Sequence, residues 1–397
     1  MTACGRSGAV VIVEKVTLMV ARKTPAASAA GSLAGFCPWA ADEPVRVYLR
    51  PVGLLPHAAW AGGAAVPLAG TRFSFNTGEL IVRKPGGRAE RTFAPLAEIM
   101  AWGWERGREV ATAVDGQLGR LTRSRPAFAG LDLKRPLIMG IINVTPDSFS
   151  DGGDHALPEQ AIAVGEAMVR AGADMLDVGG ESTRPGALPV SPEEELARVL
   201  PLVRHFAAAG VPVSVDTRNA PVMQAVMAAG ARIINDINGL RDDGALDTVV
   251  ASRAPAVIMH MQGDPRTMQN NPVYDDAALD VYDWLEQRIS ECVAAGMALE
   301  DICIDTGIGF GKTVDHNLDV LRHTAMYHGL GCPLLIGVSR KSFIGRLSRS
   351  EIPKERLAGS LAAGLECWNQ GAHILRVHDV VETVQARAIW EGLHLSA

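Results

Sequence analysis

The sequence predicts an α/β protein, a (β/α)8 TIM barrel with a small α+β extension at the N-terminus. Three observations lead to this prediction. Eight short runs of β-branched and aliphatic residues recur over about 240 residues after Lys134, most of them separated by stretches with helical periodicity. The runs are continuous rather than alternating, which is typical of parallel strands buried on both faces. Each run ends at a polar residue, and such barrels carry their active sites at the carboxyl ends of the strands.

The eight runs are predicted strands, and each is followed by a residue fit for chemistry. They are Leu137–Ile142 before Asn143, Met175–Val178 before Gly179, Val211–Val215 before Asp216, Ala231–Ile234 before Asn235, Ala256–Met259 before His260, Ile302–Ile304 before Asp305, Leu334–Val338 before Ser339, and His373–Leu375 before Arg376. Because parallel barrel strands end at one mouth, we expect these polar residues to gather there.

The composition is that of a large globular protein. The chain has 397 residues, 48% hydrophobic and 21% charged, and is longer than one barrel requires. No run approaches the roughly 18 apolar residues of a membrane helix, and the apolar run near the N-terminus is too short for a signal peptide. Six cysteines without paired spacing are typical of reduced thiols rather than of disulfides or a zinc site. We expect a cytoplasmic protein without membrane association.

Charge is unevenly distributed along the chain. Residues 1–131 hold 16 Lys and Arg against 9 Asp and Glu, whereas the remainder is net acidic. A basic segment can bind nucleic acid, but these arginines are scattered and no reading motif accompanies them. We therefore expect no nucleic-acid partner, and instead docking of the basic front part against the acidic barrel.

The chain ahead of the barrel divides into two parts. Residues 1–44 are rich in Ala, Gly and Ser without periodicity, which predicts a disordered tail. Residues 45–131 predict a small module of unknown role, and residues 132–397 the barrel. The elements expected in the module are a strand at Val45–Arg50, a hairpin of Arg72–Phe75 and Glu79–Lys84 around a turn at Asn76–Gly78, a helix from Pro95 to Leu121, and a linker at Arg120–Pro126.

The polar residues that end the strands belong to longer motifs. The chain reads MGIINVTPDSFSDGG from Met139, DVGGESTRPG from Asp177, SVDT from Ser214, IINDI from Ile233, MHMQG from Met259, GIGFGK from Gly307, GVSRKS from Gly337 and LRVHD from Leu375. This set closely resembles dihydropteroate synthase of the folate pathway over about residues 132–396. The resemblance implies a transferase, a sulfonamide target, that joins 6-hydroxymethyl-7,8-dihydropterin pyrophosphate to p-aminobenzoate and releases pyrophosphate.

The resemblance implies a pterin-binding group of residues at the barrel mouth. Adjacent donors on the pterin ring suit carboxylate acceptors, and buried carboxylates would also stabilise positive charge that develops as pyrophosphate leaves. The other interpretation is that Asp216 and Asp305 cap the following helices, and that Met259 packs in the core. The implied pterin residues are Asp216, Asn235, Met259, Asp305, Phe310, Lys341 and Arg376.

For the leaving pyrophosphate, the resemblance implies an anion site made by Asn143, Arg376 and His378. Asn143 would also ligate Mg²⁺, the implied cofactor, which prefers oxygen ligands and binds through few protein groups plus substrate phosphates. Arg376 and His378 are two residues apart, so their side chains leave the last strand on the same side.

For p-aminobenzoate, the resemblance points to the loops after the first and second strands. The pocket would consist of Phe149, Thr183, Arg184 and Pro185, with Ser342 at the carboxylate and Asp151 organising the first loop. The family also implies a homodimer formed through outer helices of the barrel.

The groups implied to act in catalysis are Lys341, Asp216, Asp305, Arg376 and His378. Two other functions stay open: a pterin-binding methyltransferase on the same barrel, and a catalytically idle pterin-binding paralogue. The sequence TGIGFGKT from Thr306 lacks the first glycine of a phosphate-binding P-loop, and we interpret it as the loop after the sixth strand. The family more often has proline at the position of Thr306.

Overall fold

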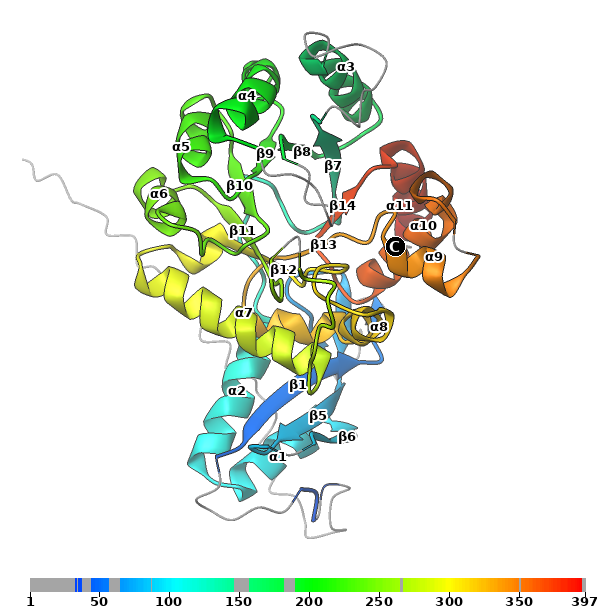
Figure 1. Ribbon diagram of the computed structural model, residues 1–397. Helices are drawn as coiled ribbons and strands as arrows, with labels where there is room; N and C mark the ends of the chain where they lie inside the picture. The colour runs from blue at the N-terminus through cyan, green and yellow to red at the C-terminus, as the bar shows by residue number, and fades with distance from the viewer. Residues whose placement is uncertain are drawn as a thin grey trace, which may run out of the picture.

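The chain forms one barrel with a smaller module attached to its side (Figure 1). This computed structural model describes residues 33, 35–37, 44–56, 65–86, 88–145, 157–181, 190–264, 267–349 and 351–394. Among these, no helix is both long enough and apolar enough to cross a membrane. The tail predicted for residues 1–44 lies almost wholly outside the described residues.

The predicted eight-stranded parallel barrel is confirmed. Neighbouring strands pair in parallel in chain order, and the last strand closes onto the first, with Ile374 opposite Leu137. Continuous burial of the apolar runs on both faces explains why their sequence does not alternate. The strands are β7 (Leu137–Asn143), β8 (Met175–Gly179), β9 (Val213–Asp216), β10 (Ile233–Asp236), β11 (Ala256–Met259), β12 (Ile302–Asp305), β13 (Leu334–Ile336) and β14 (Ile374–Val377).

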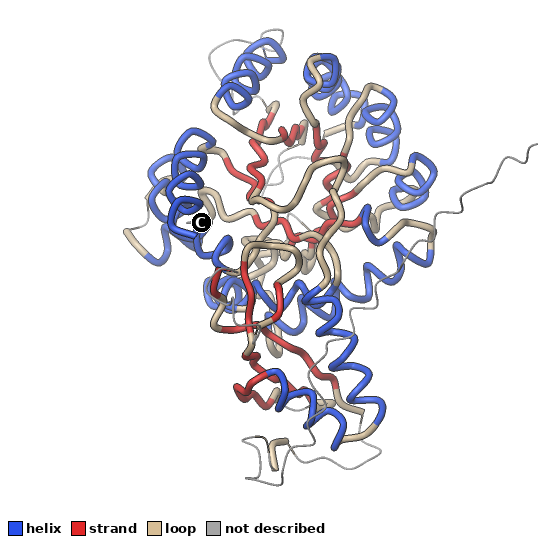
Figure 2. Tube along the Cα trace, turned by 180° about the vertical axis from the view of Figure 1, so that it is seen from behind, coloured by secondary structure: helices blue, strands red, loops and turns tan. Residues whose placement is uncertain are grey.

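Helices surround the barrel and cover the outward faces of its strands (Figure 2). They are α3 (Leu157–Arg170), α4 (Pro192–Ala208), α5 (Ala220–Ala228), α6 (Ala245–Ser252), α7 (Ala277–Ala294), α8 (Val314–Arg322), α9 (Ser342–Leu347), α10 (Leu357–Asn369) and α11 (Val380–His394). Short 3-10 helices occur at Leu299–Asp301, Thr324–Leu330 and Pro353–Glu355. The apolar faces of the barrel helices and the outward residues of the strands form the main core of the molecule.

The amino end of the barrel is closed by the segment that leads into it. Phe128 and Leu131 exchange backbone hydrogen bonds of 3.0 and 2.8 Å, and Phe128 and Leu133 pack against inward residues of the strands. Those inward residues are Leu137, Met139, Met175, Ile233, Val257, Cys303, Leu335 and Ile374. Because the bottom is filled with apolar side chains, polar chemistry is confined to the carboxyl end.

The N-terminal module is α+β, as predicted, but one of its strand pairings differs. Its larger antiparallel sheet has the order β1-β5-β6, and a smaller sheet has the order β2-β4-β3. The predicted hairpin around Asn76–Gly78 is wrong: β4 and β5 follow each other closely but belong to different sheets. The elements are β1 (Arg46–Val52), β2 (Leu55–Pro56), β3 (Val66–Pro67), β4 (Phe73–Phe75), β5 (Thr77–Arg83) and β6 (Glu90–Pro95).

The single helix predicted from Pro95 to Leu121 is two helices, α1 (Leu96–Glu105) and α2 (Arg108–Thr122). The break lies at Gly107, whose φ of 109° is accessible to glycine but not to an ordinary helical residue. The predicted linker begins too early, because Arg120–Thr122 belongs to α2. Ahead of the module, Phe36 packs against Trp102 of α1, with ring centroids 6.1 Å apart.

Electrostatic docking of the module against the barrel is confirmed at α7. Arg83 and Arg91 of the module bind Asp280 and Asp276 respectively, each at 2.6 Å, at the beginning of α7. Further along the same helix, Asp283 accepts a hydrogen bond of 2.8 Å from the Tyr48 hydroxyl. The basic front part and acidic side chains of the barrel therefore meet at α7, which lies on the side of the barrel facing the module (Figure 1). The module also contacts the 3-10 helix Thr324–Leu330, where Arg120 Nε donates to the Gly329 carbonyl.

Candidate functional site

Ten of the side chains named from the sequence lie at or just beyond the carboxyl ends of the barrel strands. They are Asn143 on β7, Asp216 on β9, Asn235 on β10, Met259 on β11, Asp305 on β12, Phe310 in the loop after β12, Lys341 and Ser342 after β13, Arg376 on β14 and His378 after it. Phe149, Asp151, Thr183, Arg184 and Pro185 lie outside the described residues, so that part of the p-aminobenzoate pocket stays a prediction.

At the centre of the mouth, one guanidinium joins carboxylates from two strands. Arg376 donates from Nε to Asp177 Oδ2 at 2.6 Å and from Nη2 to Asp216 Oδ2 at 2.8 Å. The same Asp177 oxygen accepts from Asn235 Nδ2 at 3.1 Å. Asp177 has no exposed surface, and among the described residues its hydrogen-bond partners are Arg376 and Asn235, both at Oδ2. The four residues thus form one hydrogen-bonded array across β8, β9, β10 and β14, in which Arg376 and Asn235 donate and the two aspartates accept.

Asp216 is held in an environment that makes its proton affinity unusually high. Burial raises the pKa of this carboxyl to about 7, Arg376 opposes the rise, and the nearby carboxylates Asp177 and Asp236 add to it. A carboxyl group that titrates near neutrality in a polar mouth is a functional-site signature, because it is poised to exchange between acceptor and donor roles.

The second group joins Asp305, Lys341 and Phe310 on the β12–β13 side. Burial lowers the pKa of Lys341 to about 8, while the Asp305 carboxylate opposes that fall. The Lys341 ammonium lies 4.1 Å from the centroid of the Phe310 ring, a cation–π contact. Burial also raises the pKa of Asp305, against the effects of a hydrogen bond from the Gly307 amide and of Lys341. A cation, an acid and an aromatic face therefore line one side of the mouth.

The alternative roles of the two aspartates as helix caps are wrong. The N-cap of α5 is Asn219, three residues beyond Asp216. The N-cap of α8 is Thr313, whose hydroxyl accepts from the His316 amide at 3.2 Å. Asp305 does accept a hydrogen bond of 2.8 Å from the Gly307 amide, so one of its oxygens shapes the following loop.

Met259 packs at the mouth rather than in the main core. It forms a small separate cluster with Ile237, Met261, Met268 and the partly buried Phe310. This cluster consists of residues that follow or end β10, β11 and β12, so it is an apolar wall at the level of the polar groups. Met259 itself is nearly fully buried in this cluster, so its role as a wall of the pterin slot stays a prediction.

The anion-binding candidates on β14 are oriented by residues of the β13 loop. His378 is partly buried beside Arg376 and Arg340, and desolvation together with these two cations lowers the pKa of its imidazole to about 3. Its Nδ1 lies 3.0 Å from the Ser339 hydroxyl, which in turn accepts from the His378 amide at 3.1 Å. The neutral ring is thereby fixed through Nδ1, which leaves Nε2 for a ligand.

Arg340 places Lys341 by adopting an uncommon backbone conformation. Its φ is +58°, a left-handed value for a residue with a side chain. Its amide donates to Ser360 Oγ at 2.8 Å, its carbonyl accepts from Arg356 Nη1 at 3.0 Å, and its Nε donates to Asp379 Oδ2 at 3.0 Å. The loop that bears Lys341 is therefore fixed to the segment that bears His378.

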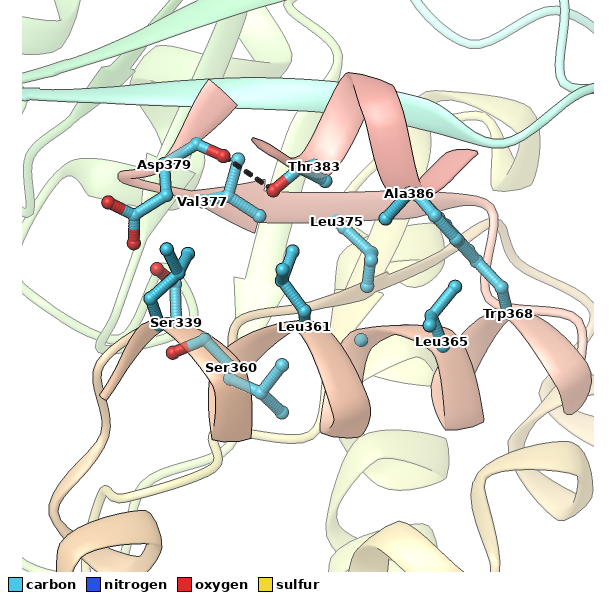
Figure 3. Close-up of a pocket in the computed structure, with 13 residues that line it drawn as sticks. Ser339, Ser360, Leu361, Leu365, Trp368, Leu375, Val377, Asp379, Thr383 and Ala386 are labelled. Atoms are coloured by element: carbon cyan, nitrogen blue, oxygen red, sulfur yellow. Dashed lines mark hydrogen bonds between the residues drawn. The ribbon is translucent and has the colours of Figure 1, made fainter. Parts of the chain in front are cut away.

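Behind these residues lies a small apolar cavity between β14 and the helices α10 and α11 (Figure 3). Leu375 and Val377 face it, and by strand alternation Arg376 faces the opposite side. Thr383 closes the cavity edge by donating its hydroxyl to the Asp379 carbonyl at 2.6 Å. The cavity therefore lies in the apolar layer between β14 and its covering helices, on the other side of the strand from the polar mouth.

The remaining two candidates are Asn143 and Ser342. The position of a Cβ on Gly179 would be 3.6 Å from Asn143 Oδ1 and 3.5 Å from Asp216 Cβ, so a glycine lies between these two side chains. Ser342 is exposed at the first position of α9. Among the described residues no three His, Cys, Asp or Glu side chains form a metal-binding group, so binding of Mg²⁺ through Asn143 stays a prediction.

Sequence reasoning missed three residues that organise the site. Asp177 was available as a signal, because an acid inside an otherwise apolar strand run must be paired when it is buried. Lys312 is 2% exposed and donates to Gly307 O and Phe310 O at 2.9 and 3.1 Å. Its position within a P-loop-like sequence drew attention away from this structural role. Ser339 stood out only as the polar residue after the seventh strand run, and only the fold brings it beside His378.

Comparison with known proteins gives a consistent result. Residues 139–378 match the model of a family described as pterin binding enzyme. The dihydropteroate synthase of Escherichia coli K12 is 49% identical over 263 residues, which are 66% of this chain and 93% of that protein. Two solved structures of the Xanthomonas albilineans dihydropteroate synthase are also similar. The structure with 4-aminobenzoic acid is 47% identical, covering 68% of this chain and 97% of that chain with a TM-score of 0.65. The structure with 7,8-dihydropteroate is 45% identical, covering 67% and 97% with a TM-score of 0.62.

The match extends over the barrel and its mouth residues, and the eight strand-end motifs lie within or at the limits of the matched range. The relatives' own lengths are almost fully covered, whereas the N-terminal module lies ahead of the matched family range. This chain belongs to the dihydropteroate synthase family of pterin-binding enzymes.

Proposed function

We propose that this chain condenses 6-hydroxymethyl-7,8-dihydropterin pyrophosphate with p-aminobenzoate at the barrel mouth, giving 7,8-dihydropteroate and pyrophosphate. The observation that carries the proposal is the array in which Arg376 joins Asp177 and Asp216 beside Asn235. Such an array holds donors and acceptors at the same level of the barrel mouth. A flat heterocycle with several polar edge atoms requires this arrangement.

The pterin would lie between the apolar wall at Met259 and Phe310 and the plane of Arg376. Asp216 and Asn235 would meet its amino-pyrimidinone edge, and Asp305 and Lys341 the other polar atoms of the ring. As the bond from the methylene carbon to the pyrophosphate oxygen breaks, positive charge spreads into the dihydropterin. The ionised carboxylates stabilise that charge, and their fixed positions cost no reorganisation during the reaction.

The departing pyrophosphate would be received by Arg376 and by Nε2 of His378. Asn143 offers an amide oxygen on the far side of Gly179 from Asp216, a donor that suits a hard cation such as Mg²⁺ held mainly by substrate phosphates. Bound Mg²⁺ would neutralise charge on the leaving group. The neighbouring Arg376 guanidinium is already paired with carboxylates, which fixes its orientation toward the phosphates.

The second substrate needs positioning rather than activation. The amine of p-aminobenzoate is neutral at pH 7, so its nitrogen can attack the methylene carbon directly and lose a proton after the C–N bond has formed. Ser342, exposed at the start of α9, would meet the carboxylate of this substrate. The loops with Phe149, Thr183, Arg184 and Pro185 would complete the pocket, and two copies of the chain would pair through outer barrel helices.

The test is release of pyrophosphate by the full chain supplied with the dihydropterin pyrophosphate, p-aminobenzoate and Mg²⁺. Release that requires p-aminobenzoate and yields dihydropteroate by mass supports the proposal. Tight pterin binding without release would favour the idle paralogue, and methyl transfer from methyltetrahydrofolate would favour the methyltransferase. Asp216→Asn should lose pterin affinity, whereas Asp243→Asn, which removes an exposed acid outside the array, should not.

A further inference from the structure

We infer that the N-terminal module supports the pterin site: Arg83 and Arg91 hold the start of α7 and, through it, the two loops that form the wall of the pterin slot. The parts of the two loops that carry the inference are residues 260–264 and 267–276 after β11, and residues 306–312 after β12. The inference rests on the proposed function in one respect, that the ligand of this slot is a pterin.

The first step is the way two carboxylates of α7 are shared. Asp276, the N-cap of α7, accepts from Arg91 Nη2 with Oδ2 at 2.6 Å and from the Leu279 amide with Oδ1 at 3.1 Å. Asp280 accepts from Arg83 Nη1 with Oδ1 at 2.6 Å and from the Asp275 amide with Oδ2 at 2.9 Å. Each carboxylate therefore uses one oxygen for a module arginine and the other for the backbone that begins the helix.

The second step leads from the start of α7 into the loop after β11. Tyr274 immediately precedes Asp275, whose carboxylate lies 3.6 Å from Arg83 and whose amide donates to Asp280. The Tyr274 hydroxyl donates to the Gly311 carbonyl at 2.7 Å. Val273 is joined to Gln262 by two hydrogen bonds, of 2.8 Å from Gln262 Nε2 and 3.0 Å to Gln262 Oε1. The returning and outgoing parts of this loop are thus fixed to each other.

The third step reaches the pterin wall. The position of a Cβ on Gly311 would be 2.5 Å from the Gln262 carbonyl, so the two loops are in direct backbone contact. Lys312 draws the second loop together by donating to Phe310 O at 3.1 Å, and its ammonium lies 2.9 Å from Nδ1 of His260 in the first loop. Phe310 in turn carries the ring that Lys341 covers.

The module also contacts α7 where no such path exists, which provides a matched control. Arg46 binds Asp283 at 3.1 Å, about two turns beyond the start of the helix, and also binds Glu286. Among the described residues neither acid bonds to the backbone at the start of α7, although Asp283 Oδ2 also lies 3.6 Å from Arg83 Nη1. Arg46→Ala therefore removes one module charge from the same helix while it leaves the support of the two loops intact.

The experiment compares the full-length Arg83→Ala/Arg91→Ala variant with Arg46→Ala and the native chain. Calorimetry should show about fivefold weaker binding of the dihydropterin pyrophosphate in the double variant, while KM for p-aminobenzoate changes less than about twofold. Hydrogen exchange should be faster in peptides 267–276 and 306–313. Arg46→Ala should match the native chain in both measurements, and Arg83→Lys/Arg91→Lys should recover most of the affinity.

Unchanged pterin affinity and unchanged exchange in a folded double variant would overturn the inference. Equal losses in Arg46→Ala would overturn it as well, because they would show a general effect of module docking. Hydrogen exchange needs no ligand. A native chain that binds no pterin would therefore refute the proposed function, while the exchange comparison would still decide whether the module supports these loops.

Discussion

Replacement of Asp177 by asparagine is the most informative single change at the barrel mouth. The residue has no exposed surface, and one of its oxygens accepts from both Arg376 Nε and Asn235 Nδ2. Asparagine keeps the shape and an acceptor oxygen but removes the charge that fixes the guanidinium. The change therefore separates the electrostatic role of the carboxylate from its packing role.

The expected size follows from the bonds that are weakened. A hydrogen bond to a charged group contributes roughly 1.5–3 kcal/mol, against about 1 kcal/mol for a neutral one. Weakening of the Arg376 and Asn235 contacts together should cost about 2 kcal/mol in positioning the pterin, which corresponds to about a 30-fold lower kcat/KM for that substrate. Steady-state release of pyrophosphate at saturating p-aminobenzoate measures this quantity, and a thermal melt verifies that the variant is folded.

A pH profile distinguishes this role from simple loss of structure. Asp216 must be ionised to stabilise the developing cation, and its pKa is raised to about 7 by burial, with Asp177 adding to the rise. Activity should therefore fall as the pH drops through about 7. Removal of the negative charge of Asp177 lowers the pKa of Asp216, so the acid limb should move to lower pH in the variant. An unmoved limb together with a kcat/KM within about twofold of native would refute the reasoning.

Three further predictions concern the cation, the metal and the backbone of the site. Lys341→Met should lower kcat/KM for the pterin about 100-fold, on the order of 3 kcal/mol. Because burial lowers the pKa of Lys341 to about 8, native activity should also fall above that pH, and a flat alkaline limb would contradict this role. Asn143→Ala should raise the Mg²⁺ concentration needed for half-maximal pyrophosphate release, about tenfold if one oxygen ligand is lost, and an unchanged requirement would exclude it as a ligand. Gly307→Ala should lower the free energy of unfolding by about 3 kcal/mol or more in urea titrations, because φ is +67° and the new Cβ would lie 1.9 Å from the His260 carbonyl oxygen. A urea midpoint equal to that of the native chain would show that the loop relaxes without cost.

The barrel could be predicted because each of its strands carries its own signal. A strand buried on both faces must be apolar throughout, so runs such as Ala256–Met259 and Ile302–Ile304 stand out against amphipathic helices. Their carboxyl ends must lie at one mouth, which places Asp216, Asp305 and Arg376 together without any structural measurement. The family motifs then assign chemistry to these positions.

The hairpin expected around Asn76–Gly78 failed for a physical reason. A turn signal shows where the chain reverses or bends, but it does not show which strands pair across it. Thr77–Arg83 pairs with Arg46–Val52 and Glu90–Pro95 instead, because those partners bury its apolar side chains in the module core. The choice among these partners depends on which side chains become buried together, and the turn residues at Asn76–Gly78 do not specify it.

By itself, the sequence determined the barrel, the mouth and most of the residues that face a ligand there, since these depend on hydrophobic period and on residue type at strand ends. Only the tertiary structure decided that Arg376 is shared by Asp177 and Asp216, that Ser339 fixes His378, and that the module holds the start of α7. These are contacts between side chains distant in sequence. Their geometry depends on how whole elements pack, which no local pattern specifies.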